Sequence, residues 1–155
     1  MIHAAKSLLI YSNVDKIYFI IEDDEFPYEL PPEIECLNLS NQTYFRPDGP
    51  NYNENLNLTY MVLIRAALAK IFPDLDRILT LDVDTLVRDN ISHLWDMDLD
   101  DYYLAATREE DLSKEEHRDY INMGVAMFNL KKMREDHIDD KIIAALNRYF
   151  YRYNE

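Results

Sequence analysis

Two aspartates one residue apart, Asp82 and Asp84, are the side chains in this sequence whose types and spacing most directly suggest chemistry. They follow a short apolar run, residues 78–81, which is typical of a buried strand in a parallel sheet. Ligands of open α/β sheets bind outside the carboxyl ends of the strands, so we expect a ligand near both carboxylates. Two carboxylates that face one point repel each other and need a shared cation or proton. Mg²⁺ or Mn²⁺ suits such oxygen ligands, and phosphate oxygens of a substrate commonly fill the open positions of the ion.

Aspartate is also common at strand ends and in turns, so a pair with this spacing is weakly informative when it stands alone. Here the pair ends an apolar strand and is followed by a second apolar pair, Leu86 and Val87. This setting favours a functional interpretation over a solvated turn.

Composition narrows the classes of protein to consider. The chain of 155 residues suits one domain, which we expect to span residues 1–155. Its net charge of −14 argues against nucleic-acid and anionic-membrane partners, because both reward a basic surface. The two glycines, Gly49 and Gly124, are too few for a Gly-rich phosphate loop or a dinucleotide-binding GxGxxG. The single cysteine, Cys36, permits no internal disulfide, and without an apolar span of about 18 residues we expect a cytoplasmic protein.

Apolar runs and their periodicity predict strands and helices that alternate along the chain. Strands are expected at residues 16–21, 34–39, 78–81, 102–107 and 124–130, and helices at residues 3–12, 57–71, 90–95 and 139–153. Residues 40–55 are polar and are expected to form a long loop. The alternation predicts an α/β fold with a mostly parallel sheet flanked by helices.

One charged residue, Arg65, interrupts the expected helix at residues 57–71, which is otherwise apolar almost all round. A helix of that kind is buried, and a buried arginine needs an anionic partner. That partner is either an aspartate of the core or the phosphate of a ligand.

Three blocks of the sequence resemble family 8 glycosyltransferases, the retaining enzymes of the GT-A fold that include glycogenin and bacterial lipooligosaccharide galactosyltransferases. The first block, residues 63–77, resembles the family's arginine-bearing helix and its P-x-L-D-K/R exit. The second, residues 78–95, resembles LYLDxDxLV…LW, and the third, residues 120–130, resembles YFNxGVxLxNL. The spacing between the blocks also fits, and the match covers roughly residues 4–134. The resemblance implies a GT-A-like (Rossmann-like) fold that is incomplete relative to the family.

The resemblance also implies how a donor substrate binds. Asp82 and Asp84 would hold Mn²⁺, or Mg²⁺, against the diphosphate of a nucleotide sugar, which we expect to be UDP-linked. Val83 would lie against the nucleoside, and Arg65 would contact the sugar or the diphosphate. The metal would neutralise the leaving diphosphate as a Lewis acid. The implied activity is transfer of a hexose to a glycan, lipid or protein acceptor that the sequence does not identify.

The third block implies contacts with the transferred sugar. Asn122 and the backbone near Met123 would make them, which adds Asn122 to the two aspartates as a catalytic candidate. Gly124 fits a place where the backbone approaches a ligand closely. A turn before a strand explains Gly124 equally well from the sequence alone, so both interpretations stay open.

The chain departs from the family pattern at both ends. Family members open with a strand that holds the nucleotide base, and they continue to a histidine that completes the metal site. None of the four histidines here matches that residue, although His117 could substitute for it. With the first strand and the C-terminal part lacking, we expect self-association through an uncovered sheet edge and through Tyr149, Phe150 and Tyr153.

Two other functions are compatible with the sequence. The DVDTL segment at residues 82–86 also resembles the DxDxT motif of haloacid dehalogenase-like phosphatases, in which the first aspartate is phosphorylated. Alternatively, the chain binds a nucleotide sugar and a metal, or acts as a structural module, without catalysing transfer.

Overall fold

The computed structural model describes residues 1–51, 60–108 and 121–150, which form two compact units. Residues 1–41 and 79–128 make up the first unit, and residues 42–78 and 129–155 make up the second. Each unit therefore combines two stretches that are distant in the sequence. The expectation of a single domain stays a prediction.

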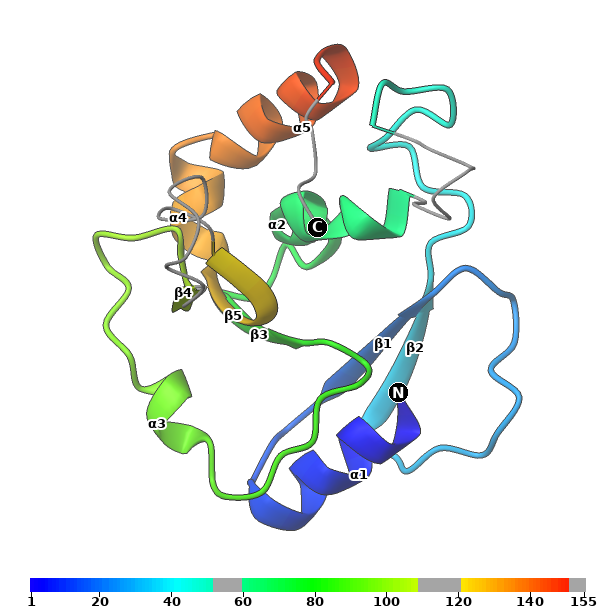
Figure 1. The fold of residues 1–155 in the computed structure, drawn as a ribbon, viewed down its shortest axis with the longest axis vertical. Helices are drawn as coiled ribbons and strands as arrows, with labels where there is room; N and C mark the ends of the chain where they lie inside the picture. Colours follow the sequence, from blue (N-terminus) through cyan, green and yellow to red (C-terminus); the bar gives the residue numbers. More distant parts are fainter. Residues whose placement is uncertain (52–59, 109–120, 151–155) are drawn as a thin grey trace, which may run out of the picture. The chain divides into compact units, whose positions relative to one another are not determined.

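The first unit begins with a helix followed by two parallel strands. Helix α1 (Ile2–Tyr11) leads into β1 (Ile17–Ile21) and β2 (Ile34–Asn38), with Ile17 opposite Ile34 at the start of the register (Figure 1). These bounds confirm the helix and both strands predicted in this region. The proline-rich connection between the strands has no regular structure, because proline removes backbone donors and restricts its neighbours.

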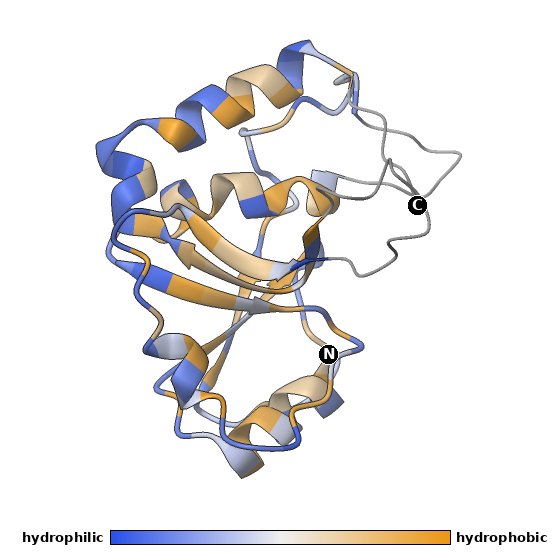
Figure 2. Cartoon of the chain, turned by 60° about the vertical axis from the view of Figure 1, so that its left-hand side comes forward, coloured by the Kyte–Doolittle hydropathy of each residue, from blue (hydrophilic) through white to orange (hydrophobic). Residues whose placement is uncertain are grey.

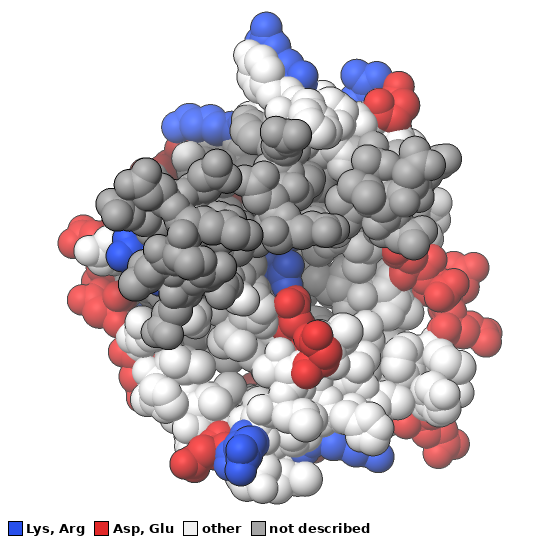
Figure 3. Space-filling view, in the orientation of Figure 1, with Lys and Arg blue, Asp and Glu red and all other residues white. Residues whose placement is uncertain are grey.

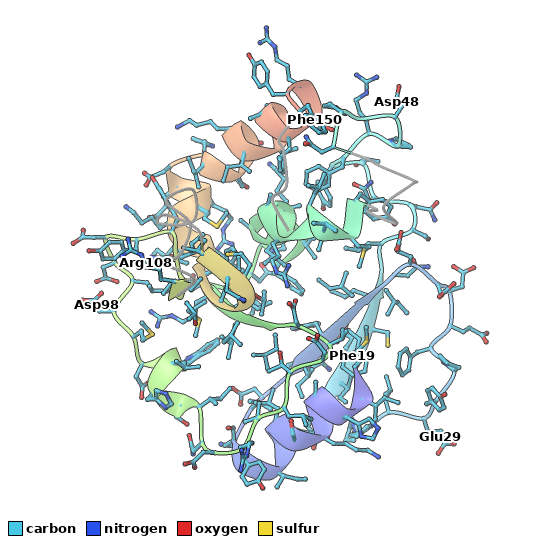
Figure 4. The ribbon with its side chains drawn as sticks, in the orientation of Figure 1. Phe19, Glu29, Asp48, Asp98, Arg108 and Phe150 are labelled. Carbon is cyan, nitrogen blue, oxygen red and sulfur yellow. The ribbon has the colours of Figure 1, made fainter. Side chains whose placement is uncertain are left out.

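Apolar side chains join α1 to this pair of strands. Ala5, Phe19 and Ile34 form the buried centre of the cluster. Phe19 lies between β1 and α1, and its ring packs edge-on against Phe26 with centroids 5.3 Å apart (Figure 4). Such an arrangement of aromatic rings adds to the stabilisation from burial alone. The cluster fixes α1 on the β1–β2 pair.

A second sheet in the first unit carries the residues of chemical interest. Its strands are β3 (Arg77–Leu81), β4 (Leu104–Arg108) and β5 (Ile121–Asn129), in the order β3-β5-β4, and the short helix α3 (Ser92–Trp95) lies between β3 and β4 in the chain. Successive residues of the middle strand, Ala126 to Phe128, are all buried, as expected for a strand covered on both faces. The predicted strands are confirmed, although β5 begins three residues earlier than expected.

The pairing of β4 with β5 is antiparallel and is interrupted by a bulge. Ala106 lies opposite Ala126, but the next residue, Thr107, lies opposite Asn122. Residues 123–125 of β5 therefore have no partner position in β4. Bulges bend a strand, re-aim side chains and are often found next to functional sites.

In the second unit, the predicted helix at residues 57–71 takes a different form. Residues 57–59 lie outside the described part, and the rest forms η2 (Tyr60–Val62), η3 (Ile64–Ala67) and the single turn α2 (Leu68–Ile71). Backbone bonds such as Ala66 N to Leu63 O, 2.9 Å, span three residues as in a 3₁₀ helix. The prediction of one continuous α-helix is wrong, because two 3₁₀ segments and a single α-helical turn replace it. Phe72-Pro73 ends the segment as predicted.

The chain ends in two helices, α4 (Leu130–Glu135) and α5 (Ile138–Arg148). His137, with φ of 53°, adopts the left-handed conformation that separates them. In α5 hydrophilic and hydrophobic residues alternate around the helix (Figure 2). The prediction that this helix reaches residue 153 is wrong, because Tyr149 is extended. Tyr149 and Phe150 are exposed, and Tyr153 lies outside the described residues.

Asparagine side chains hold the predicted long loop against α5. The Asn147 amide donates to the Tyr44 carbonyl at 2.7 Å and accepts from the Arg46 N–H at 3.1 Å. The buried Asn51 donates to the carbonyls of Leu146 and Tyr149. The described part of the loop therefore has fixed backbone partners within its own unit.

An ion pair in the second unit should make its stability depend on pH. The Lys70 ammonium lies 2.7 Å from Asp140, and this hydrogen bond lowers the pKa of Asp140 below its ordinary value of 3.8. A lowered folded-state pKa means that the pair stabilises the protein above pH 3.8 and that this contribution is lost as the pH falls further. We expect the coupling in a double-mutant cycle of Lys70→Gln and Asp140→Asn to be small at neutral pH, because the carboxylate is exposed, and to vanish in acid. Urea unfolding at a series of pH values measures it, and a coupling that grows in acid would contradict the assignment.

The α/β class is confirmed, and the β1–β2 sheet is parallel as predicted. The sequence predicted a mostly parallel sheet, and the antiparallel β4–β5 pair differs from that prediction. Within the described ranges, no helix combines the length and apolar character needed to cross a membrane.

Candidate functional site

A cleft of about 560 Å³ lies in the first unit, where β3, β4 and β5 meet the turn that follows β3. The residues described as lining it are Asp82, Asp84, Thr85, Thr107, Arg108, Asn122, Gly124 and Val125. The two aspartates therefore share one cleft with the bulged part of β5. Such a cleft, lined mainly by polar and charged side chains, is a candidate site for a polar small ligand.

The backbone around Asp82 explains how both carboxylates reach the cleft. The Asp82 N–H donates to the Gly124 carbonyl at 2.8 Å, which ties the end of β3 to β5. The Asp82 carbonyl then accepts from the Thr85 N–H at 3.0 Å, which closes a turn. Asp82 is half-buried and Asp84, within the turn, is exposed. Asp82 and Asp84 therefore line the same cleft although one residue separates them.

At Gly124 it is space, and not backbone conformation, that restricts a side chain. Its φ is not positive, but a Cβ atom at this position would lie 3.0 Å from Asn122 Oδ1 and 3.1 Å from Asp82 Oδ2. The Asn122 oxygen also accepts from the Gly124 N–H at 2.8 Å. A carboxylate oxygen and an amide oxygen therefore both lie against the same glycine.

Charges in the cleft are mixed. Asp82 and Asp84 contribute carboxylates, and Arg108, at the end of β4, contributes a guanidinium (Figure 4). Elsewhere acidic side chains occupy several separate places on the face shown in Figure 3, in a chain of net charge −14. An anionic ligand would therefore depend on Arg108, or on a cation held by the aspartates, for local compensation.

The structure separates the predicted site residues into two groups. Asp82, Asp84, Asn122 and Gly124 line the cleft, whereas Val83, which is 57% exposed, and the half-buried Met123 are not among its described lining residues. Their predicted contacts with nucleoside and sugar stay predictions.

Two further candidates lie elsewhere. Arg65 is half-buried in η3 of the second unit, and its contact with a donor also stays a prediction. His117, proposed as a substitute metal ligand, lies outside the described residues.

Four lining residues were missed by sequence reasoning, namely Thr85, Thr107, Arg108 and Val125. Thr107 was assigned to a strand, and Arg108 lies one residue beyond the strand predicted at residues 102–107. The register that places Thr107 opposite Asn122 brings the end of β4 to the site. A signal was present, since both residues end an apolar strand, but the bulge that sets their position has no sequence signature.

The oxygen atoms of this cleft fit a hard divalent cation. Asp82, Asp84 and Asn122 offer two carboxylates and one amide oxygen, the ligand types that Mg²⁺ and Mn²⁺ take. Within residues 1–51, 60–108 and 121–150, no group of three or more His, Cys, Asp or Glu side chains is placed to hold a metal ion.

Comparison with protein-family models identifies one family for this chain. The sequence model of glycosyl transferase family 8 matches residues 1–153. A curated Haemophilus influenzae protein named "Putative glycosyltransferase" is 28% identical, over 91% of this chain and 48% of that protein. General stress protein A of Bacillus subtilis is 25% identical, over 62% of this chain and 37% of that protein.

Solved structures of glycosyltransferases are also similar to this chain. The galactosyltransferase LgtC, in complex with donor and acceptor sugar analogues, aligns with a TM-score of 0.50 and 25% identity over 76% of this chain and 47% of that one. The apo form of the glycosyltransferase GlyE from Streptococcus pneumoniae aligns with a TM-score of 0.67 over 99% of this chain and 36% of that one; at 21% identity this shows a shared fold.

The chain spans about half the length, or less, of the relatives it matches. The family match nevertheless extends over nearly all of it and includes every residue of the cleft. The chain belongs to glycosyl transferase family 8.

Proposed function

We propose that this chain forms the donor-binding part of a metal-dependent glycosyltransferase that transfers a hexose from a nucleotide sugar, with UDP as the nucleotide. The observation that carries the proposal is the convergence of Asp82, Asp84 and Asn122 on one cleft. The family match supports the reaction class. The similarity to a galactosyltransferase, solved with donor and acceptor sugar analogues, supports a hexose as the transferred group.

Asp82 and Asp84 would hold the cation, with Asn122 as a third oxygen ligand or as a contact of the sugar. Bound there, Mn²⁺ or Mg²⁺ would supply Lewis-acid stabilisation of the leaving diphosphate. The side chains have separate tasks. The half-buried Asp82 is oriented by the β3–β5 contact, and the exposed Asp84 lies in the turn that can meet an incoming ligand.

Arg108 has a role of its own in this proposal. Its guanidinium presents several N–H donors in a planar fork, which matches a phosphate or carboxylate oxygen pair. From the end of β4 it would help to orient the anionic part of the donor and offset the acidic character of the chain.

The runner-up function is donor and metal binding without turnover. The length of the chain supports this alternative. The chain spans about half of its relatives' length, and binding needs fewer groups than transfer does. Membership of glycosyl transferase family 8 argues against the alternative function as a haloacid dehalogenase-like phosphatase. Release of UDP from a UDP-hexose in the presence of Mn²⁺ separates transfer or hydrolysis from binding alone.

Calorimetric titration of UDP with and without Mn²⁺ tests the proposed site. Two carboxylates should hold the metal weakly, and the diphosphate should bind weakly to a chain of net charge −14. Each ligand should raise the affinity for the other by the same factor. The corresponding coupling free energy is typically about 1–3 kcal/mol. Formation of the Mn²⁺–UDP complex in free solution is subtracted. Equal UDP affinity with and without Mn²⁺ would rule out a site in which metal and diphosphate meet.

A further inference from the structure

The segment that carries Asp84 is held by the Ser7 side chain of α1 and by the side chain of Ser12, the residue that follows this helix. The Ser7 hydroxyl accepts a hydrogen bond from the Val87 N–H at 2.9 Å, and the Ser12 hydroxyl accepts one from the Ile91 N–H at 3.1 Å. In Figure 1 the chain after β3 runs past α1, in agreement with these bonds. Residues 82–91 form no helix or strand, so these contacts replace the support that regular structure would give.

The hydrogen bond from Val87 to Ser7 is well suited to fix the backbone. Val87 is only 7% exposed, so water is a poor substitute for its acceptor. The Ser7 hydroxyl also donates to the Ala4 carbonyl at 2.7 Å, which fixes its orientation toward Val87. A serine hydroxyl has one proton to donate and lone pairs to accept, so both bonds can form together.

Helix α1 is itself a rigid support. Its Ala5 side chain is buried with Phe19 and Ile34 in the cluster on the β1–β2 strands. The other end of the aspartate segment is fixed by the bond from Asp82 N–H to the Gly124 carbonyl. Asp84, which is exposed and has few packing restraints of its own, therefore lies between one anchor on β5 and another on α1.

We propose that Ser7 is a positioning residue of the donor site: its bond to Val87 sets the conformation of residues 83–87 and thereby places Asp84 beside Asp82. This inference rests on the proposed function, since it concerns the same cleft. It assigns to α1, which contributes no described residue to the cleft lining, a part in ligand binding. Sites held by packed secondary structure keep their geometry better than sites held by loops alone.

The substitution Ser7→Ala tests this role. Alanine is the best helix former, so α1 should persist while the Val87 N–H loses a buried acceptor. We expect amide hydrogen exchange at Val87 and its neighbours to become roughly tenfold faster, without a matching change in β1. The Mn²⁺-dependent gain in UDP affinity should fall by about fivefold.

Three variants separate positioning from general stability. Ser7→Thr keeps the hydroxyl and should restore both readouts. Ser12→Ala removes the bond to Ile91, seven residues beyond Asp84, and should affect UDP affinity less than Ser7→Ala does. Ser40→Ala removes an exposed serine of the same unit and should leave both readouts at the parent values.

The possible results lead to different conclusions. If the parent shows Mn²⁺-dependent UDP binding and Ser7→Ala shows the same gain, the positioning role is overturned while the proposed function stands. It is likewise overturned if exchange rises equally throughout the first unit, since Ser7 then has a general structural role. If the parent shows no such gain, the proposed function fails and this inference fails with it.

Discussion

Replacing Asp84 by asparagine is expected to remove most of the Mn²⁺-dependent gain in UDP affinity, which we put at about 1–3 kcal/mol in the parent. Asparagine keeps the size of the side chain but loses the charge that a cation between the two aspartates requires. Because Asp84 is exposed and lies in a turn, the fold should be unaffected. Titration of UDP with and without Mn²⁺, on parent and variant, measures the change.

The matched control for this experiment is Asp101→Asn. Asp101 is an exposed aspartate of the same unit that is not among the described cleft residues, and its replacement changes net charge by the same amount. UDP affinity should respond to Mn²⁺ in this control as in the parent. A gain that survives in Asp84→Asn would remove Asp84 from the site, and an equal loss in both variants would show that only net charge matters.

The second large effect is expected from Gly124→Ala. The new methyl group would lie 3.0–3.1 Å from Asn122 Oδ1 and Asp82 Oδ2, so one of these side chains must move by a few tenths of an ångström. Catalytic groups are sensitive to displacements of this kind, and we expect kcat/KM for UDP release from a UDP-hexose to fall by about tenfold. The melting temperature should change little, because Gly124 does not have a positive φ.

Gly49→Ala provides the comparison. An added Cβ there would also be close to its surroundings, 3.0 Å from the Arg46 carbonyl, but Gly49 belongs to the second unit. It should alter stability without lowering the Mn²⁺-dependent gain in UDP affinity. If Gly124→Ala binds UDP and Mn²⁺ as the parent does and releases UDP at the parent rate, the arrangement of oxygens around Gly124 is not part of the site.

The positions of the strands could be read from the sequence because each is a short apolar run with polar residues at its ends. The same pattern led to Asp82 and Asp84, and their place at a strand end was predicted correctly. Asn122 and Gly124 were found through family resemblance, since neither residue type alone distinguishes a site from a loop. The structure brings these four residues to one cleft, while their roles in binding stay predictions.

Other features could not be foreseen because tertiary contacts decide them. The bulge in β5 depends on pairing with β4, and it determines that Thr107 and Arg108 reach the cleft. The apolar stretch around Arg65 has the composition of a buried helix, yet its backbone is mainly 3₁₀. Helix α5 ends at Arg148, where the buried Asn51 side chain donates hydrogen bonds to the carbonyls of Leu146 and Tyr149. No local sequence pattern predicts this contact.

The strand order β3-β5-β4 has a consequence for folding during synthesis. The middle strand is the last of the three to leave the ribosome, so β3 and β4 are translated before the strand that pairs with both of them exists. Until about residue 129 has emerged, each of these two strands presents unpaired backbone donors and acceptors to other chains. The nascent chain should therefore be most prone to aggregation between the emergence of β4 and the emergence of β5 from the ribosome, and chaperone binding would matter most in that interval.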